Sequence, residues 1–179
     1  MKRIFSAGLI LLFLDAGRPA HGNAEVSADS SGAAGALFRQ GRTRLSVGAG
    51  YGVFNKNDYF VLGLGAGYYF IDGLEAGLDG ETWIGSQPQI YNVSPQIRYI
   101  LPEILGFRPY AGGFYRRTFY SRELANLNSA GARAGLVFPL SPRTYITAGA
   151  VYEHYFKCDT AIYSTCDNLY PEAGISFAY

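Results

Sequence analysis

The sequence predicts an all-β protein built as a closed eight-stranded antiparallel β-barrel, and three observations support this fold class. Apolar and polar residues alternate with a period of two over most of the chain. Charged residues fall almost entirely in one phase of that alternation. Glycine and aromatic residues are numerous, with 23 Gly, 15 Tyr and 12 Phe among 179 residues. Many strands without long apolar runs are typical of sandwiches and barrels.

The first residues, MKRIFSAGLILLFLDAGRPAHGNAE, have the parts of a secretory signal. Lys2 and Arg3 give a positive start, residues 4–14 form an apolar core, and small residues precede a cleavage point after Ala24. A membrane anchor is the alternative, but this core is too short to cross a bilayer of about 30 Å as a helix. Residues 1–24 are therefore predicted to be a cleaved signal peptide.

The remaining chain divides into two parts. Residues 25–42 are rich in Ala, Ser and Gly, which predicts a flexible N-terminal segment. Residues 43–179 carry the alternating pattern and are predicted to form the barrel. Basic and acidic residues are nearly balanced after the signal is removed, so the chain has no field that would attract nucleic acid.

Eight segments follow the period-two rule. The second, DYFVLGLGAGYYF, shows it most clearly, because glycines alternate with large apolar residues in an order that a helix would keep only at a heavy propensity cost. Short connections alternate with longer ones, as in outer-membrane barrels with periplasmic turns and exterior loops. The segments are residues 43–54, 58–70, 74–84, 89–101, 107–119, 130–140, 144–156 and 168–179.

The position of the charges decides which phase faces inward. One phase is apolar and rich in aromatic residues, and only Arg117 and His154 carry charge in it, near the ends of their segments. The other phase holds a predicted lumen charge network of Arg44, Glu75, Asp79, Glu81, Arg98, Arg108, Arg116, Arg133, Glu153 and Glu172.

A soluble barrel such as a lipocalin would turn the apolar phase inward. The lumen of eight strands is only just wide enough for side chains, and this phase is too rich in aromatic residues to fit there. With the apolar phase outward against lipid, the charges pair inside, where paired and hydrogen-bonded ions are tolerated. The prediction is therefore a transmembrane β-barrel with an up-and-down meander.

Aromatic residues of the outward phase support this orientation. They gather near the two ends of the segments and leave aliphatic and small residues between them. Two such belts match the two membrane–water interfaces. One belt contains Tyr68, Phe70, Tyr99, Phe107, Phe138, Phe177 and Tyr179, and the other Tyr51, Phe60, Tyr91, Tyr115, Tyr152 and Phe156.

Both cysteines, Cys158 and Cys166, lie in the stretch KCDTAIYSTCD. In an exported protein this spacing predicts a disulfide that closes one loop. A metal site is a poor alternative, because His154 is the only histidine after the signal and there is no third thiol. No cofactor is expected, since neither a phosphate-binding loop nor a metal-ligand spacing is present.

The last eight residues, EAGISFAY, resemble the sorting signal read by the bacterial barrel-assembly machinery. Glu172, Gly174, Phe177 and Tyr179 occupy its polar, glycine and two terminal aromatic positions. Residues 43–179 also resemble the small eight-stranded outer-membrane proteins of the OmpA-barrel and OmpX type. The stretches YYFIDGLEAGL, SPQIRYILP and RPYAGGFYRR are similar to proteobacterial outer membrane β-barrel domain proteins. The resemblance implies location in a bacterial outer membrane, with membrane lipid and the assembly machinery as partners.

Catalysis is not expected from these residues. The stretch EHYF resembles the region of lipid A 3-O-deacylases in which a nucleophilic serine follows the histidine by two residues, but Phe156 occupies that position here. His154 would need another serine, such as Ser121, Ser129 or Ser164. An enzyme that modifies lipid A is therefore the third hypothesis for this chain.

The first hypothesis is a structural or surface interaction protein with a plugged, salt-bridged lumen. It would bind an extracellular or envelope protein through its exterior loops, because loops on a rigid scaffold commonly carry binding. The second is a narrow pore or a conduit for small apolar solutes of the OmpW type, which needs a continuous path through the lumen.

Overall fold

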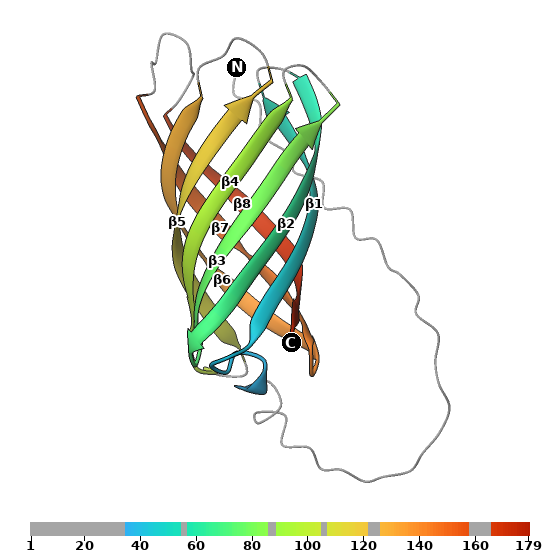
Figure 1. The fold of residues 1–179 in the computed structure, drawn as a ribbon, viewed down its shortest axis with the longest axis vertical. Helices are drawn as coiled ribbons and strands as arrows, with labels where there is room; N and C mark the ends of the chain where they lie inside the picture. The colour runs from blue at the N-terminus through green and yellow to red at the C-terminus, as the bar shows by residue number, and fades with distance from the viewer. Residues whose placement is uncertain (1–34, 55–56, 86–88, 105–106, 122–125, 158–165) are drawn as a thin grey trace, which may run out of the picture.

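A computed structural model describes residues 35–54, 57–85, 89–104, 107–121, 126–157 and 166–179. Eight antiparallel strands follow one another in sequence order around a closed barrel, which confirms the predicted fold class (Figure 1). The strands are β1 (Thr43–Phe54), β2 (Asn57–Ile71), β3 (Leu74–Ile84), β4 (Ile90–Ile100), β5 (Arg108–Tyr120), β6 (Leu127–Ser141), β7 (Thr144–Phe156) and β8 (Asp167–Ala178).

The strand boundaries agree closely with the alternating pattern. β1, β3 and β7 begin and end at the predicted residues, and the other strands differ by at most three residues at either end. In the part of the chain that the structure describes, no helix is long and apolar enough to cross a membrane.

The polarity of the barrel is the reverse of that of a soluble protein. In β4, buried and exposed residues alternate without exception from Ile90 to Ile100. Arg98 is only 4% exposed, whereas its apolar neighbour Ile97 is 51% exposed. On β2 the outward Leu64 is 68% exposed. The period of two thus places polar and charged side chains in the lumen and apolar ones outside.

The short turns and the C-terminus lie at one end of the barrel, called here the C-terminal end, and the longer connections lie at the opposite loop end (Figure 1). The turn between β2 and β3 contains Gly73, whose φ of 77° favours glycine. The chain closes on itself at this end, where the backbones of Thr43 and Tyr179 exchange hydrogen bonds of 3.0 and 2.9 Å.

Glycines make room for large side chains in the narrow lumen. A Cβ added at Gly149 would lie 2.6 Å from the hydroxyl of Tyr110, and one added at Gly135 would lie 2.8 Å from the ring of the same tyrosine. Both distances are too short for a real contact. Glycine on β6 and β7 is therefore what allows Tyr110 to cross the lumen from β5.

The expectation of a flexible segment over residues 25–42 is wrong for residues 35–42. Leu37 and Phe38 are 0% and 3% exposed and pack into the C-terminal end of the lumen. The backbone oxygen of Phe38 accepts a 2.7 Å hydrogen bond from the amide of Gly73, and the amide of Gly41 donates to the oxygen of Tyr69.

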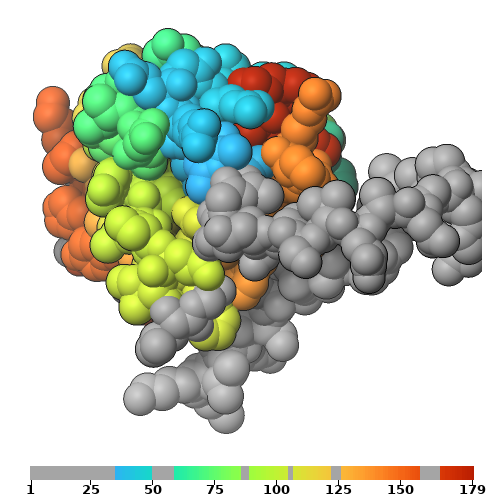
Figure 2. All heavy atoms as spheres, turned by 90° about the horizontal axis from the view of Figure 1, so that it is seen from below, coloured from blue at the N-terminus to red at the C-terminus, as the bar shows by residue number. Residues whose placement is uncertain are grey.

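The prediction failed because it rested on the average composition of the segment. Leu37 and Phe38 are two adjacent large apolar residues, and their burial favours docking against the barrel. Figure 2 views the barrel from this end, where the blue atoms of the earliest described residues lie against the end face. Residues 25–34 lie outside the described part of the chain.

Candidate functional site

The lumen contains ion pairs at three levels along the barrel axis. The residues come from β1, β3, β4, β5, β6, β7 and β8, and the inward phase of each strand positions them. The three levels are called here the C-terminal cluster, the middle cluster and the loop-end cluster. Their geometry differs, and the difference bears on what each can do.

The C-terminal cluster is a compact triad. Both carboxylate oxygens of Glu75 are paired, at 2.6 Å with Nε of Arg44 and at 2.9 Å with Nη2 of Arg98. None of these three side chains is more than 5% exposed. Arg98 also donates to the hydroxyl of Tyr145, which lies 3.0 Å from the hydroxyl of Tyr69. The two ion pairs of Glu75 offset much of the desolvation of these ions, although Nε of Arg98 is buried without a hydrogen-bond partner among the described residues.

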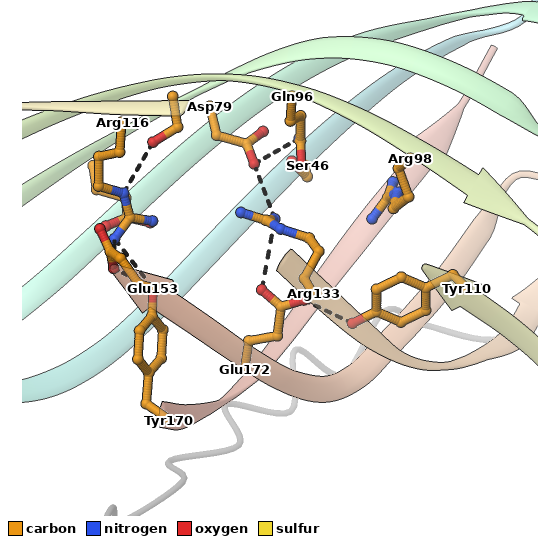
Figure 3. A network of polar contacts seen from close by, with 12 residues as sticks. Ser46, Asp79, Gln96, Arg98, Tyr110, Arg116, Arg133, Glu153, Tyr170 and Glu172 are labelled. Carbon is orange, nitrogen blue, oxygen red and sulfur yellow. Dashed lines mark hydrogen bonds and ion pairs between the residues drawn. The ribbon is translucent and has the colours of Figure 1, made fainter. Parts of the chain in front are cut away.

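The loop-end cluster is centred on Arg116, which binds side chains from four other strands, β3, β4, β7 and β8 (Figure 3). Its guanidinium lies 3.1 Å from both Glu81 and Glu153, and its Nε donates to the hydroxyl of Ser94 at 3.0 Å. The hydroxyl of Ser129 donates to the second oxygen of Glu153 at 2.5 Å. This guanidinium is thereby held by hydrogen bonds on all of its nitrogens.

The middle cluster is looser. Nη1 of Arg133 lies 3.4 Å from Asp79 and 3.6 Å from Glu172. Shorter contacts hold these carboxylates. Asp79 lies 3.1 Å from Nη2 of Arg44, which links this cluster to the C-terminal one. Gln96 also donates to Asp79, and Tyr110 donates to Glu172, each at 2.7 Å (Figure 3). Among the described residues, Nε of Arg133 is buried without a hydrogen-bond partner.

A cavity of about 530 Å³ adjoins the middle cluster. Arg133, Asp79 and Glu172 line it, together with Arg44 on its C-terminal side and Arg116 on its loop side. Small residues on β1, β2, β7 and β8 form the facing wall. The free volume of the lumen therefore lies beside the least firmly paired arginine.

The predicted charge network can be compared with the ion pairs of the lumen, and one of its residues lies elsewhere. Nine of the ten predicted residues form the three clusters. Arg108 instead pairs at 3.2 Å with Glu103, outside the predicted set, and its guanidinium lies 5.9 Å from the ring centre of Phe38. The reason is that β5 begins at Arg108, so the side chain is at the C-terminal end.

The sequence did not single out the tyrosines that join the network. Tyr69, Tyr145 and Tyr170 lie in the inward phase, which was the available signal, and their hydroxyls bond to one another or to the charged groups. A tyrosine in the polar phase therefore indicates a polar contact in the lumen as well as a charged residue does.

The predicted assembly signal occupies the end of β8. Phe177 and Tyr179 belong to the outward phase, and Glu172 and Gly174 to the inward one. Recognition by an assembly machinery remains a prediction. The predicted disulfide also remains a prediction, since Cys158 lies outside the described residues while Cys166 lies just before β8.

His154 lies at the loop end. Its Nδ1 is 2.8 Å from Asp167, and both side chains are about half exposed. Of the serines considered as nucleophiles, Ser129 is fully buried and donates to Glu153, and Ser121 accepts a hydrogen bond from the amide of Gln89. Ser164 lies outside the described residues. Within the described ranges, no group of three or more His, Cys, Asp or Glu residues could hold a metal ion.

No protein-family model matches this chain, and no curated protein matches it. Several solved structures, in contrast, match this chain. The N-terminal β-barrel domain of OprF from Pseudomonas aeruginosa has a TM-score of 0.56 at 16% identity, over 78% of this chain and 98% of that one. Neisserial surface protein A has a TM-score of 0.49 at 15% identity, over 76% and 93%. OprG from P. aeruginosa has a TM-score of 0.44 at 12% identity, over 80% and 98%.

The likeness to the OprF domain concerns the fold, since 16% identity is too low to carry function. With the closed meander of eight strands, it shows that the chain has the fold of the small eight-stranded outer-membrane β-barrels.

Proposed function

We propose that this chain is an outer-membrane β-barrel protein with a filled lumen, which acts as a structural or surface interaction protein. The observation that carries the proposal is the reversed polarity of the barrel. Large apolar side chains face outward on every strand, while ion-paired arginines and carboxylates lie inside.

The outward surface supports a lipid environment. Leu64, Leu78 and Ile97 are each more than half exposed and lie on consecutive strands. A contiguous apolar surface of this extent is rare on a soluble monomer and costs free energy in water in proportion to its area. In a bilayer the same surface is favourable, and each strand pairs its backbone with both neighbours, except along the loop-side halves of β1 and β8.

The filled lumen supports a role that does not depend on conduction. Leu37 and Phe38 close the C-terminal end, and the triad of Arg44, Glu75 and Arg98 lies directly above them. The cavity beside Arg133 does not include any residue of this apolar closure. These contacts favour the plugged barrel over a pore that runs from end to end.

The first test combines location with conductance. We expect the protein to fractionate with the outer membrane and to migrate faster on gels before heating than after it. Purified protein in planar bilayers should show no stable single-channel conductance. A steady conductance from the wild-type protein would contradict the filled lumen and support the narrow-pore alternative.

The second test concerns the loops. A partner protein should be cross-linked on intact cells by the wild-type chain, and the yield should fall when residues 158–165 are replaced by a Gly–Ser linker of equal length. The matched control replaces residues 105–106, in the connection between β4 and β5, in the same way. Equal loss in both variants would contradict binding through the exterior loops.

A further inference from the structure

Arg117 is a cation in the apolar outward phase of β5, close to the loop end. Its side chain is exposed, and its outward neighbours on the same strand, Tyr115 and Phe119, are 44% and 37% exposed. Tyr115 belongs to the loop-end aromatic belt, and such belts mark the level of the lipid head groups. In the proposed membrane location, Arg117 therefore lies where the charges of the lipids are.

Among the described residues, no carboxylate forms an ion pair with Arg117. Its guanidinium instead lies 5.4 Å from the ring centre of Phe119, a contact that holds the cation without neutralising it. The cross-strand neighbours of Arg117 are neutral, with Val93 on β4 and Asn128 on β6. Arg133 in the lumen differs in this respect, because two carboxylates flank it. Of these two arginines, Arg117 is the one that an anion can approach without repulsion from a paired carboxylate.

A second cation lies beside the same row of residues. Asn128 pairs with Phe156 on its other side, and Lys157 follows directly at the end of β7. Lys157 is exposed and has no ion-pair partner in the described chain. Adjacent strands lie about 4.8 Å apart, so the backbones of Arg117 and Phe156 are roughly 10 Å apart across β6. The long side chains of Arg117 and Lys157 can therefore reach one group above Asn128.

The outward carboxylate of Asp167 does not offset these two charges. Asp167 lies on β8, three strands away from Arg117. One of its oxygens accepts a 2.6 Å hydrogen bond from Tyr152 and lies 2.8 Å from Nδ1 of His154. The loop-end part of the outward face over β5, β6 and β7 is therefore positively charged among the described residues.

A shallow hollow of about 370 Å³ lies in the barrel wall between β4 and β5, on the membrane side of Arg117. Two causes produce it. Pro95 has no N–H to donate, so the ladder lacks two residue pairs there, and Gly113 has no side chain to fill the space. The outward residues that line the hollow are Pro95, Ile97, Gly113 and Tyr115, with Gln96 and Phe114 between them. Its surface is mainly apolar, and Tyr115, the outward residue next to Arg117, forms its loop-side edge.

We propose that Arg117 and the β4–β5 hollow form a binding site for a phosphorylated glycolipid of the lipid A class. One phosphate accepts hydrogen bonds from the guanidinium of Arg117, whose planar donors fit a phosphate bidentately, and Lys157 adds a second cation. An acyl chain of the lipid lies in the hollow. The site rests on the proposed outer-membrane location, in which the longer connections face the exterior leaflet, where lipids of this class reside.

The first experiment measures lipid binding by native mass spectrometry of the purified full-length protein in detergent micelles. We expect one molecule of bis-phosphorylated lipid A per barrel, bound about ten-fold more tightly than its dephosphorylated analogue. Phosphatidylglycerol should bind more weakly than lipid A. Equal affinity for the two forms of lipid A, or for phosphatidylglycerol, would overturn the glycolipid site.

The second experiment tests the cations. Arg117→Gln should weaken binding of lipid A about ten-fold, and Lys157→Gln about three-fold. Arg117→Lys should restore only part of the loss, because an ammonium group cannot bind a phosphate bidentately. The loss should disappear with the dephosphorylated analogue, which a merely structural role of Arg117 would not explain.

The matched control for the arginine is Arg143→Gln. Arg143 is also exposed but lies in the turn between β6 and β7, at the C-terminal end, so its removal should leave lipid A binding unchanged. Heat-dependent gel migration identifies the folded variants. A folded Arg117→Gln protein that binds lipid A like the wild type overturns the proposal, and if this variant does not fold, the lipid comparison on the wild-type protein decides.

The third experiment fills the hollow. A Cβ added at Gly113 would meet only the backbone oxygen of Gly131, at an ordinary 3.6 Å, so Gly113→Leu should fold. This substitution should weaken lipid A binding several-fold, whereas Ala111→Leu, an outward position of β5 outside the hollow, should not. Unchanged binding by a folded Gly113→Leu protein would overturn the hollow as the site of the acyl chain.

Failure of this site and failure of the proposed function give different results. A protein that fractionates with the outer membrane but binds lipid A no better than the dephosphorylated analogue overturns this site and leaves the proposed function intact. A protein that does not fractionate with the outer membrane contradicts the proposed function itself.

Discussion

The C-terminal and middle clusters use the same residue types but differ in how firmly those residues are held. Glu75 has no exposed surface and sits between two arginines at 2.6 and 2.9 Å. Arg133 sits between two carboxylates at 3.4 and 3.6 Å, and these carboxylate side chains are 18% and 23% exposed. The sequence pattern alone does not distinguish the two, since all of these residues share the inward phase.

The difference follows from solvent access and from what surrounds each cluster. Below Glu75, Leu37 and Phe38 exclude water from the C-terminal end, so the ions there depend strongly on their partners. Arg133 adjoins the cavity, and its longer ion pairs cost less free energy because its carboxylate partners are partly exposed. The first arrangement therefore stabilises the barrel more than the second.

The largest expected effect is at the C-terminal cluster. Glu75→Ala leaves two buried guanidinium groups without their shared carboxylate, and removal of one member of a buried ion pair typically costs about 3–5 kcal/mol. Urea-induced unfolding in detergent micelles, followed by gel migration, measures the change. A loss below about 1 kcal/mol would show that the triad is not the firmly held element.

The second effect is at the seal below that cluster. Phe38→Ala removes a ring that packs edge-on against Tyr69 and Tyr145, and truncation of a buried phenylalanine costs about 3 kcal/mol or more. The same substitution should admit water to Glu75 and raise the bilayer conductance. The matched control is Phe70→Ala, at an outward position that is 37% exposed. Equal destabilisation by both substitutions would contradict a seal at residues 37 and 38.

A smaller effect is expected at the middle cluster. Arg133→Gln removes two long ion pairs and should cost about 1.5 kcal/mol, near the lower limit for hydrogen bonds to charged groups. The same unfolding assay gives the comparison with Glu75→Ala. If the two substitutions cost the same, the distinction between a firmly held and an adaptable cluster is wrong.

The smallest effect is expected at the barrel end. Glu103→Gln weakens the 3.2 Å pair with Arg108, in which the glutamate side chain is 37% exposed. Partly exposed pairs of this kind contribute less than about 1 kcal/mol, and salt screens them. Unfolding at low and high salt should therefore differ little between this variant and the wild-type protein. A large effect would place Arg108 in the lumen network after all.

Much of the fold could be predicted from the sequence, because the period of two fixes which side chains share a face. The alternation of the sequence over β4 predicts Arg98 inside and Ile97 outside, and the burial pattern of the strand agrees. The C-terminal octet likewise indicated a strand that ends at the last residue.

The pairing of the charges could not be predicted in the same way. Arg116 on β5 binds Glu81 on β3 and Glu153 on β7, each two strands away across the lumen. Such contacts depend on the stagger and tilt of the strands around the barrel, which the parity of single strands does not encode. The displaced position of Arg108 has the same origin.

Two other features could not be predicted from the sequence, because they depend on contacts that form only in the assembled barrel. The docking of Leu37 and Phe38 depends on an apolar space that exists only when β2 and the strands from β4 to β8 come together at one end. The limited pairing of β1 with β8 depends on the register of the assembled strands, which the sequence of a single strand does not encode.

The central claim is the reversed polarity of the barrel, and an accessibility scan along β4 tests it most directly. Single spin labels at successive positions from 90 to 100, in protein reconstituted in lipid bilayers, are exposed to oxygen and to a water-soluble nickel complex. Labels at 91, 93, 95, 97 and 99 should collide often with oxygen, and those at the even positions should not. High oxygen accessibility at the even positions, with the odd ones shielded from lipid, would contradict the claim.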